Sequence, residues 1–103
     1  MMNKYRAKKT VIDGKKFDSK KEAERYQELK LLLQAGQINE LRCQITFPLT
    51  AHGIKICSYR ADFVYTVNGE MHVEDVKGFR TPVYKLKKKL FEANYPWLRI
   101  EER

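Results

Sequence analysis

The stretch RADFVYTVNGEMHVEDVKG, residues 60–78, decides the fold because it holds two strands and the turn between them. Phenylalanine, valine, tyrosine and threonine favour a strand before Asn68-Gly69, valine favours one after it, and Asn-Gly is a preferred pair for a two-residue hairpin turn. Asp62 interrupts the first apolar run, and Asp75 lies near the end of the second. A carboxylate on a half-buried strand needs a cation, a metal ion or a substrate as its partner. These two aspartates are therefore the first candidate functional residues.

The N-terminal part of the sequence predicts a small hairpin followed by a helix. TVIDGKKF, residues 10–17, alternates around an Asp-Gly pair that is typical of a tight turn. SKKEAERYQELKLLLQAG, residues 19–36, is rich in helix formers and ends at a glycine. Its predicted apolar stripe consists of Ala23, Tyr26, Leu29 and Leu33.

The rest of the chain predicts three consecutive strands, a second helix and a last strand. The strands cover residues 38–49, 56–67 and 70–76, and WLRIE, residues 97–101, is the last one. The second helix covers residues 82–94, because proline suits the first turn of a helix. Its predicted packing face consists of Val83, Leu86 and Leu90. The order hairpin-α-β-β-β-α-β predicts an α/β fold with a mixed central β-sheet flanked by helices.

Length and charge restrict the class of protein. A chain of 103 residues predicts one domain, residues 1–103, in which residues 1–9 form a basic flexible arm. The 21 Lys and Arg residues against 13 Asp and Glu residues give a net charge of +8, which favours a polyanion partner, although solvated surface charge is an alternative.

We expect a cytoplasmic protein, because the sequence has neither an apolar membrane span nor a hydrophobic signal region. Cys43 and Cys57 do not have zinc-site spacing, so we expect free thiols.

A carboxylate, one spacer and a lysine recur four times, and only one of these pairs lies on a predicted strand. The pairs are Asp13/Lys15, Asp18/Lys20, Glu28/Lys30 and Asp75/Lys77. Alternate strand residues share a face, so Asp75 and Lys77 should project together, with Asp62 nearby on the adjacent strand. Two close carboxylates repel each other, and Mg²⁺ would reverse that repulsion. The alternative is a structural ion pair between aspartate and lysine.

Glu22 is a third candidate carboxylate. Ser19 and Glu22 match the S-x-x-E capping box of a helix start, which could by itself explain the glutamate. Glu22 also continues the predicted apolar stripe of the first helix, so it should face the sheet and the two aspartates. Glu74 and His72 project to the opposite face from Asp75, where we expect a solvated or supporting glutamate and an ordinary surface histidine.

Three segments in this order resemble the PD-(D/E)XK nuclease superfamily: FDSKKEAE (residues 17–24), RADF (60–63) and VEDVKG (73–78). The similarity is greatest to the phage endonuclease I type, the Holliday junction resolvases, and to small uncharacterised phage proteins. It implies a restriction-endonuclease-like core in which Asp62, Asp75, Glu22 and the Val76 carbonyl hold Mg²⁺ or Mn²⁺. It further implies that Lys77 positions the attacking water or stabilises charge on the phosphate, leaving 5′-phosphates.

The sequence departs from this superfamily at two places. Ala61 replaces the proline of the motif, and the chain ends soon after the last strand, where the endonuclease I type continues. We expect a metal-dependent, structure-selective DNA endonuclease that resolves Holliday junctions as a homodimer, since two symmetric cuts need two sites. The alternatives are a less selective phage nicking or recombination-associated nuclease, and a non-catalytic basic DNA-binding module.

Basic residues near the hairpin and the second helix are the candidate DNA contacts. They are Lys4, Arg6, Lys8, Lys9, Lys15, Lys16, Arg80, Thr81, Lys85, Lys88 and Lys89. Thr81 is included because a helix start can hold a phosphate.

Overall fold

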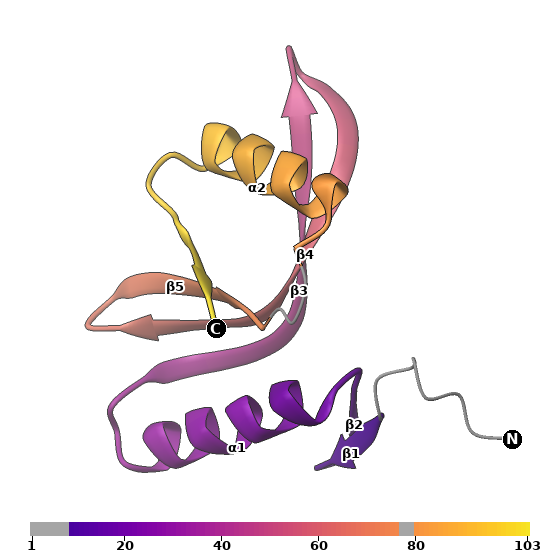
Figure 1. Cartoon of the computed structure of the whole chain (residues 1–103). Coiled ribbons are helices and arrows are strands. Elements are labelled where there is room, and N and C mark those ends of the chain that lie inside the picture. The colour runs from indigo at the N-terminus through magenta and orange to yellow at the C-terminus, as the bar shows by residue number, and fades with distance from the viewer. Residues whose placement is uncertain (1–8, 77–79) are drawn as a thin grey trace, which may run out of the picture.

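A mixed four-stranded sheet with one helix near each end forms the centre of the molecule (Figure 1). The structure is a computed structural model, and it describes residues 9–76 and 80–103. The elements, in chain order, are β1 (Thr10–Ile12), β2 (Lys15–Phe17), α1 (Lys20–Gln34), β3 (Asn39–Ala51), β4 (Ile54–Val67), β5 (Glu70–Asp75), α2 (Pro82–Asn94) and β6 (Ile100–Glu102). The predicted order of elements is confirmed, and so is the α/β class with a mixed sheet.

The sheet has the order β3-β4-β5-β6. β3 and β5 both run antiparallel to β4, whereas β5 and β6 run parallel and are joined through α2. Asn68 and Gly69 have φ values of 51° and 83°, as a two-residue turn with two left-handed residues requires. The predicted central hairpin is therefore confirmed, and its register of pairing follows from this turn.

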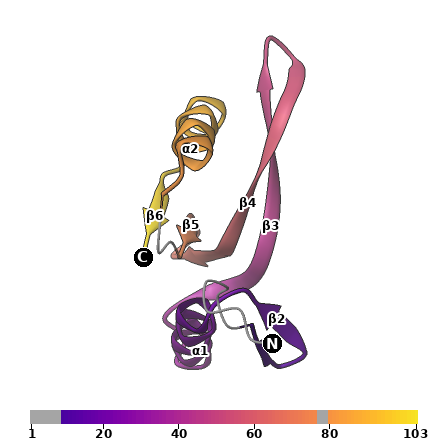
Figure 2. The same cartoon turned by 45° about the vertical axis from the view of Figure 1, so that its right-hand side comes forward.

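Half of the β3–β4 hairpin extends beyond the rest of the sheet. β5 pairs with β4 only over residues 63–67, whereas β3 and β4 remain paired from Ile45 and Ala61 to Ala51 and Ile54. This two-stranded part, which we call the arm, projects beside α2 in both views (Figures 1 and 2). A bulge lies between Leu49 and Thr50 of the arm.

Two hydrophobic cores lie on the two sides of the sheet. The core under α1 includes Phe17, Tyr26, Leu29, Phe63 and Tyr65. The core under α2 includes Leu49, Tyr59, Val64, Val73, Tyr84, Phe91 and Ile100. Because strand residues alternate between faces, Phe63 and Tyr65 pack toward α1 while Val64 packs toward α2.

The predicted helix faces are partly wrong. Leu33 is exposed, so the apolar stripe of α1 stops at Leu29. On α2 the buried residues are Tyr84 and Phe91, whereas Val83 and Leu86 are exposed. The two aromatic side chains bury more apolar surface than aliphatic ones, so the helix turns them toward the sheet.

Two further expectations concern the C-terminal strand and the cysteines. The last strand begins at Ile100 rather than at Trp97, because a turn in which the Leu98 amide donates to the Tyr95 carbonyl precedes it. Cys43 and Cys57 are free thiols, as predicted. None of the helices in the described ranges is long and apolar enough to span a membrane.

Candidate active site

Asp62 of β4 and Asp75 of β5 lie side by side. Phe63 pairs with Glu74, so the antiparallel register places the preceding Asp62 opposite the following Asp75. The two carboxyl groups are close enough to share a hydrogen bond. Asp75 is buried, and Asp62 is half-buried. The structure thus brings together the two aspartates that the sequence identified.

Burial and neighbouring negative charge raise the pKa of the Asp62 carboxyl group. Loss of solvent is the largest cause that raises the pKa of Asp62 to about 7, and the carboxylates of Glu22 and Asp75 raise it further. The Val76 amide opposes this effect, because it donates a hydrogen bond of 2.7 Å to Oδ2 of Asp62. A carboxyl group that binds a proton near neutral pH lies in a site that favours added positive charge.

Tyr59 holds Asp75 in place. Its buried hydroxyl donates a hydrogen bond of 2.6 Å to Oδ2 of Asp75. Burial and this carboxylate raise the pKa of Tyr59 well above its ordinary value, so the hydroxyl stays protonated and remains a donor. Sequence reasoning missed Tyr59, because strict strand alternation would place it on the opposite face from Asp62, three residues later.

Glu22 is buried in the first turn of α1, close to the aspartates. Its backbone amide donates to Oγ of Ser19 at 3.1 Å, which confirms the predicted N-cap. Burial is the largest cause that raises the pKa of Glu22, and the charge of Asp18 adds to it. Oε1 of Glu22 has no hydrogen-bond partner among the described residues. A buried polar atom in this state favours an additional partner.

The three carboxylates do not form one ligand shell. Within residues 9–76 and 80–103, no three His, Cys, Asp or Glu side chains are close enough together to bind a single metal ion. The aspartate pair is assembled, and Glu22 acts on Asp62 through its charge. Val76 is half-buried beside the pair, whereas Lys77 lies outside the described residues, so the roles assigned to both remain predictions.

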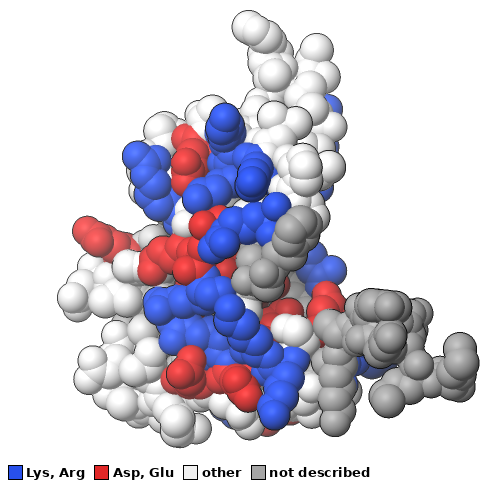
Figure 3. Space-filling view, viewed as in Figure 1, with Lys and Arg blue, Asp and Glu red and all other residues white. Residues whose placement is uncertain are grey.

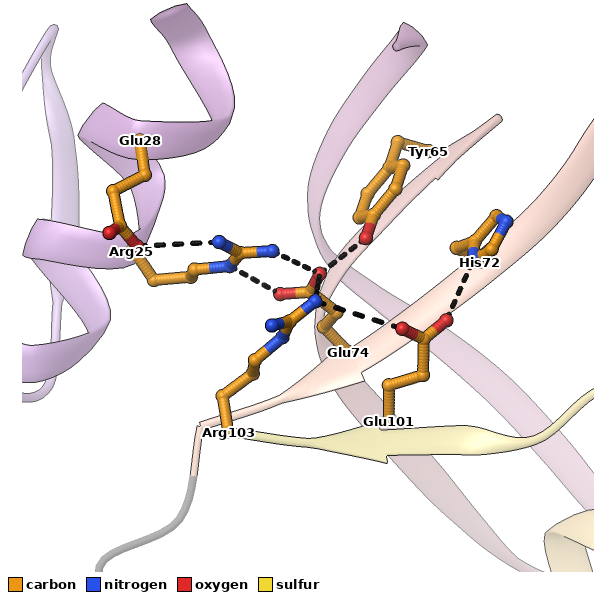
Figure 4. A network of polar contacts seen from close by, with 7 residues as sticks. All are labelled: Arg25, Glu28, Tyr65, His72, Glu74, Glu101 and Arg103. Carbon is orange, nitrogen blue, oxygen red and sulfur yellow. Dashed lines mark hydrogen bonds and ion pairs between the residues drawn. The ribbon is translucent and has the colours of Figure 1, made fainter. Parts of the chain in front are cut away.

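A buried ion-pair network fixes α1 against β5 (Figure 4). Arg25 donates from Nε and Nη2 to the two carboxylate oxygens of Glu74, each at 2.7 Å. Tyr65 and Arg103 also donate to Oε2 of Glu74. Burial by itself would raise the pKa of Glu74, but the hydrogen bonds from Arg25 and Tyr65 outweigh it and keep this pKa below its ordinary value.

Of the two roles expected for Glu74, the solvated one is therefore wrong, because the side chain is fully buried, and the supporting one fits its contacts. An arginine that lies 49 residues away in the sequence gives no local signal of this pairing. The network matters for the site because Arg25 follows Glu22 by one helical turn and Glu74 precedes Asp75. His72 lies in the same region, where its Nδ1 is 2.6 Å from Oε2 of Glu101.

The predicted DNA contacts fall into four groups. Lys4, Arg6 and Lys8 lie outside the described residues, and Lys9, Lys15, Lys16, Lys85 and Lys89 are exposed. Arg80 and Lys88 instead approach the Glu102 carboxylate, at 3.0 and 3.5 Å. Thr81 caps α2, because its Oγ1 accepts a hydrogen bond from the Tyr84 amide. Figure 3 shows basic side chains over α2 and over α1, with acidic side chains between them.

Comparisons with known proteins give one match. A family model described as "Protein of unknown function (DUF1064)" matches residues 2–102. No curated protein and no solved structure matches the chain significantly. Because the family model matches nearly the whole length, the chain belongs to the DUF1064 family of proteins of unknown function.

Proposed function

We propose that this protein is a metal-dependent, structure-selective DNA endonuclease that resolves Holliday junctions, with a sheet that corresponds to a restriction-endonuclease-like core. The observation that carries the proposal is the pair of adjacent carboxyl groups at Asp62 and Asp75, one of which has its pKa raised to about 7. Such a pair is a costly arrangement in the absence of a cation. Within the pair, Asp75 lies two residues before Lys77, in the D-x-K spacing of the nuclease motif.

The donor atoms of this site fit Mg²⁺. Two carboxylates and the Val76 carbonyl are hard oxygen ligands, and Mg²⁺ is usually held by one or two carboxylates while water and substrate phosphate fill the remaining positions. Mn²⁺ accepts the same oxygen ligands. When bound, such an ion would lower the pKa of a water molecule and stabilise negative charge on the phosphate.

The residues of the chain have separate roles in this proposal. Asp62 and Asp75 hold the cation, and the Val76 amide and the Tyr59 hydroxyl orient these two carboxylates. Glu22 adds negative charge beside them. Lys77 positions the attacking water or stabilises the charge that develops on the phosphate, and cleavage leaves a 5′-phosphate.

Exposed lysines would bind the DNA backbone. Lys15 and Lys16 on β2 and Lys85 and Lys89 on α2 are exposed, and the net charge of +8 favours a polyanion. Such contacts position the duplex without reading its sequence.

Cleavage assays test the proposal directly. A labelled four-way junction and a linear duplex of the same sequence are incubated with the protein and Mg²⁺, with EDTA added to a parallel sample. We expect paired cuts in the junction that disappear with EDTA and in Asp75→Asn. The control Glu70→Gln, at the exposed other end of β5, should cut normally. Metal-independent cutting, or full activity of Asp75→Asn, would overturn the proposal.

A non-catalytic DNA-binding module is the second candidate. It is supported by the hydrogen bonds that Asp62 and Asp75 receive from Val76 and Tyr59, since these would also suit a purely structural cluster. Retarded migration of DNA in a gel without any metal-dependent cut would favour this module. Cutting of junction and duplex at equal rates would instead favour a less selective nuclease.

A further inference from the structure

The outer face of α2 carries an apolar stripe that the described residues leave largely uncovered, although Leu90 within it packs partly against the core. Val83, Leu86, Leu90 and Ala93 follow one another at steps of three, four and three residues, which is the spacing of a helix face that packs on another helix. Within the monomer α2 instead packs through Tyr84 and Phe91. The helix therefore has two apolar faces, and only one of them meets the sheet.

The arm forms the other wall of an apolar groove beside this stripe. Ala51, Ile56 and Cys57 from the arm, together with Val83, Leu86 and Leu90 from α2, line a groove of about 670 Å³. Lys87 and Lys89 lie at its edge. An apolar floor with a charged rim is typical of a protein interface.

Only the tip of the arm lacks support in the monomer, because α2 covers the part of the arm that carries Leu49 and Tyr59. The arm is a two-stranded ribbon, since β5 stops at the level of Phe63 and pairs no further along β4. A two-stranded hairpin is marginally stable in water unless another strand or a helix covers one face. Its side chains Ile54 and Ile56 are 66% and 59% exposed, so a partner in the groove would stabilise the arm as well.

We infer that a second copy of this chain occupies the groove, through α2 packed antiparallel on α2 of the partner and the arms on either side. The stripe is self-complementary in this arrangement, because an antiparallel two-fold places Leu86 near Leu90 of the partner and Val83 near Ala93 of the partner. A two-fold contact uses the same patch on both copies, as this one does.

The exposed apolar area agrees with a dimer of moderate affinity. Val83 and Leu86 are 64% and 67% exposed, which is similar to the two isoleucines of the arm. At roughly 100 Å² for a fully exposed aliphatic side chain, these four residues expose on the order of 250 Å² per copy. Two copies would bury on the order of 500 Å² of such surface, which is most of the apolar part of an interface at the lower end of stable dimers. We expect dissociation in the micromolar range.

Charge gives the dimer a diagnostic salt dependence. Each copy carries a net charge of +8, and Lys87 and Lys89 flank the groove, so two copies repel each other at low ionic strength. Salt screens this repulsion. Self-association should therefore strengthen as salt rises, whereas contacts with DNA phosphates weaken.

Sedimentation equilibrium of the full chain, from low to high micromolar concentration at low and high salt, tests the inference. The variants are Leu86→Glu and Val83→Glu, with Leu31→Glu as the matched control. Leu31 is 66% exposed on α1, at the other end of the molecule, so the control places the same charge on an equally exposed leucine (Figure 1). Circular dichroism and the unfolding midpoint show whether each variant is folded.

We expect a wild-type dimer that tightens with salt, an unchanged dimer in Leu31→Glu, and a dissociation constant raised about tenfold or more in the two groove variants. A monomeric wild type at high salt would overturn the inference. So would an intact dimer in both groove variants, or a dimer that only Leu31→Glu disrupts.

The idea that this dimer pairs two DNA cuts rests on the proposed endonuclease function. A nicking assay on linear duplex distinguishes failure of the dimer inference from failure of the proposed function. A protein that dimerises but never cuts DNA would support the proposed interface and contradict the nuclease function. A monomer that nicks DNA in a metal-dependent way would contradict the interface and support the nuclease function.

Discussion

Ionisation of the Asp62 carboxyl group destabilises the folded, metal-free chain. Burial disfavours its negative charge, and two neighbouring carboxylates add to the cost. The same features favour a bound cation, because a divalent ion cancels both the repulsion and the lost hydration. A site of this kind lowers the stability of the metal-free protein in exchange for affinity toward the metal.

Asp62→Asn should stabilise the metal-free protein at neutral pH. The folded pKa of about 7 exceeds the ordinary value of 3.8, so folding favours the protonated form. The wild type therefore keeps its full stability below about pH 4 and loses part of it as the pH rises through 7. We expect the variant to unfold with a free energy higher by about 1–3 kcal/mol at pH 8, with little difference at pH 4.

Urea denaturation in EDTA at pH 4 and pH 8 measures this difference. Added Mg²⁺ should then raise the wild-type midpoint and leave that of the variant unchanged, because ligand binding stabilises only a chain that binds it. A variant less stable than the wild type at pH 8 would contradict the prediction.

Tyr59→Phe should weaken metal binding more than it weakens folding. The change removes the hydrogen bond that orients Asp75, and losing such a supporting contact typically lowers metal affinity by about 10- to 100-fold. The cost to stability should be about 1–2 kcal/mol. Calorimetric titration with Mn²⁺ measures the affinity.

Tyr95→Phe is the matched control for this change. It removes a hydroxyl that donates to the Pro48 carbonyl at 2.8 Å, away from the aspartates. Its Mn²⁺ affinity should equal that of the wild type. Equal losses of affinity in both tyrosine variants would argue against an orienting role for Tyr59.

At the scale of elements, the important contact is the one that fixes α1 on β5. α1 carries Glu22, and β5 carries Asp75. The bidentate contact between Arg25 and Glu74 fixes the height and rotation of the helix relative to the strand. The geometry of the candidate site therefore depends on a buried ion pair that does not itself belong to the site.

Glu74→Gln should destabilise the fold by about 3–5 kcal/mol, since it leaves Arg25 without its buried counter-charge. The folded pKa of Glu74 is lowered, so this carboxylate stabilises the wild type above about pH 4 and stops doing so as the pH falls through its folded pKa. The variant should therefore lose less stability in acid than the wild type. Urea denaturation at pH 7 and at pH 3 measures both effects.

Glu28→Gln supplies the control, because Glu28 pairs with the same arginine at 3.3 Å from an exposed position. An exposed ion pair contributes little, so this variant should unfold almost like the wild type. A similar loss in both variants would show that the burial of Glu74 is unimportant.

At the scale of the whole molecule, charge and shape divide the surface into regions of different chemistry. Lysines and arginines lie over the two helices, as Figure 3 shows, whereas the arm and the outer face of α2 are mainly apolar. The first kind of surface suits a nucleic acid, and the second suits protein. The molecule is also thin, with extents of 43 × 41 × 20 Å, so much of each face is open to partners.

Replacing Lys85 and Lys89 together by glutamine should weaken DNA binding at low salt. The affinity falls as salt rises, and each lost phosphate contact should reduce the magnitude of the slope of log affinity against log salt by about 1. The slope of the double variant should therefore be smaller in magnitude by about 2. Fluorescence anisotropy with labelled duplex over a range of salt measures the slope. Lys55→Gln, at the exposed tip of the arm, is the control and should keep the wild-type slope. An unchanged slope in the double variant would exclude α2 from the DNA interface.

The sequence by itself determined the features that depend on near neighbours in the chain. The Asn68-Gly69 turn fixed the central hairpin, and its register placed Asp62 opposite Asp75. Ser19 set the start of α1, and Pro82 set the start of α2. Turn chemistry, capping and periodicity are local properties, so they can be read without knowledge of the rest of the fold.

Only the tertiary structure decided which surfaces meet. It buried Glu74 against an arginine from another element, placed Tyr59 on Asp75, and turned the aromatic rather than the aliphatic face of α2 toward the sheet. Each outcome depends on competition between contacts that are distant in sequence, and periodicity identifies an apolar face without naming its partner. The stripe of Val83 and Leu86 was read correctly as apolar, but it is left uncovered because the larger Phe91 fills the core instead.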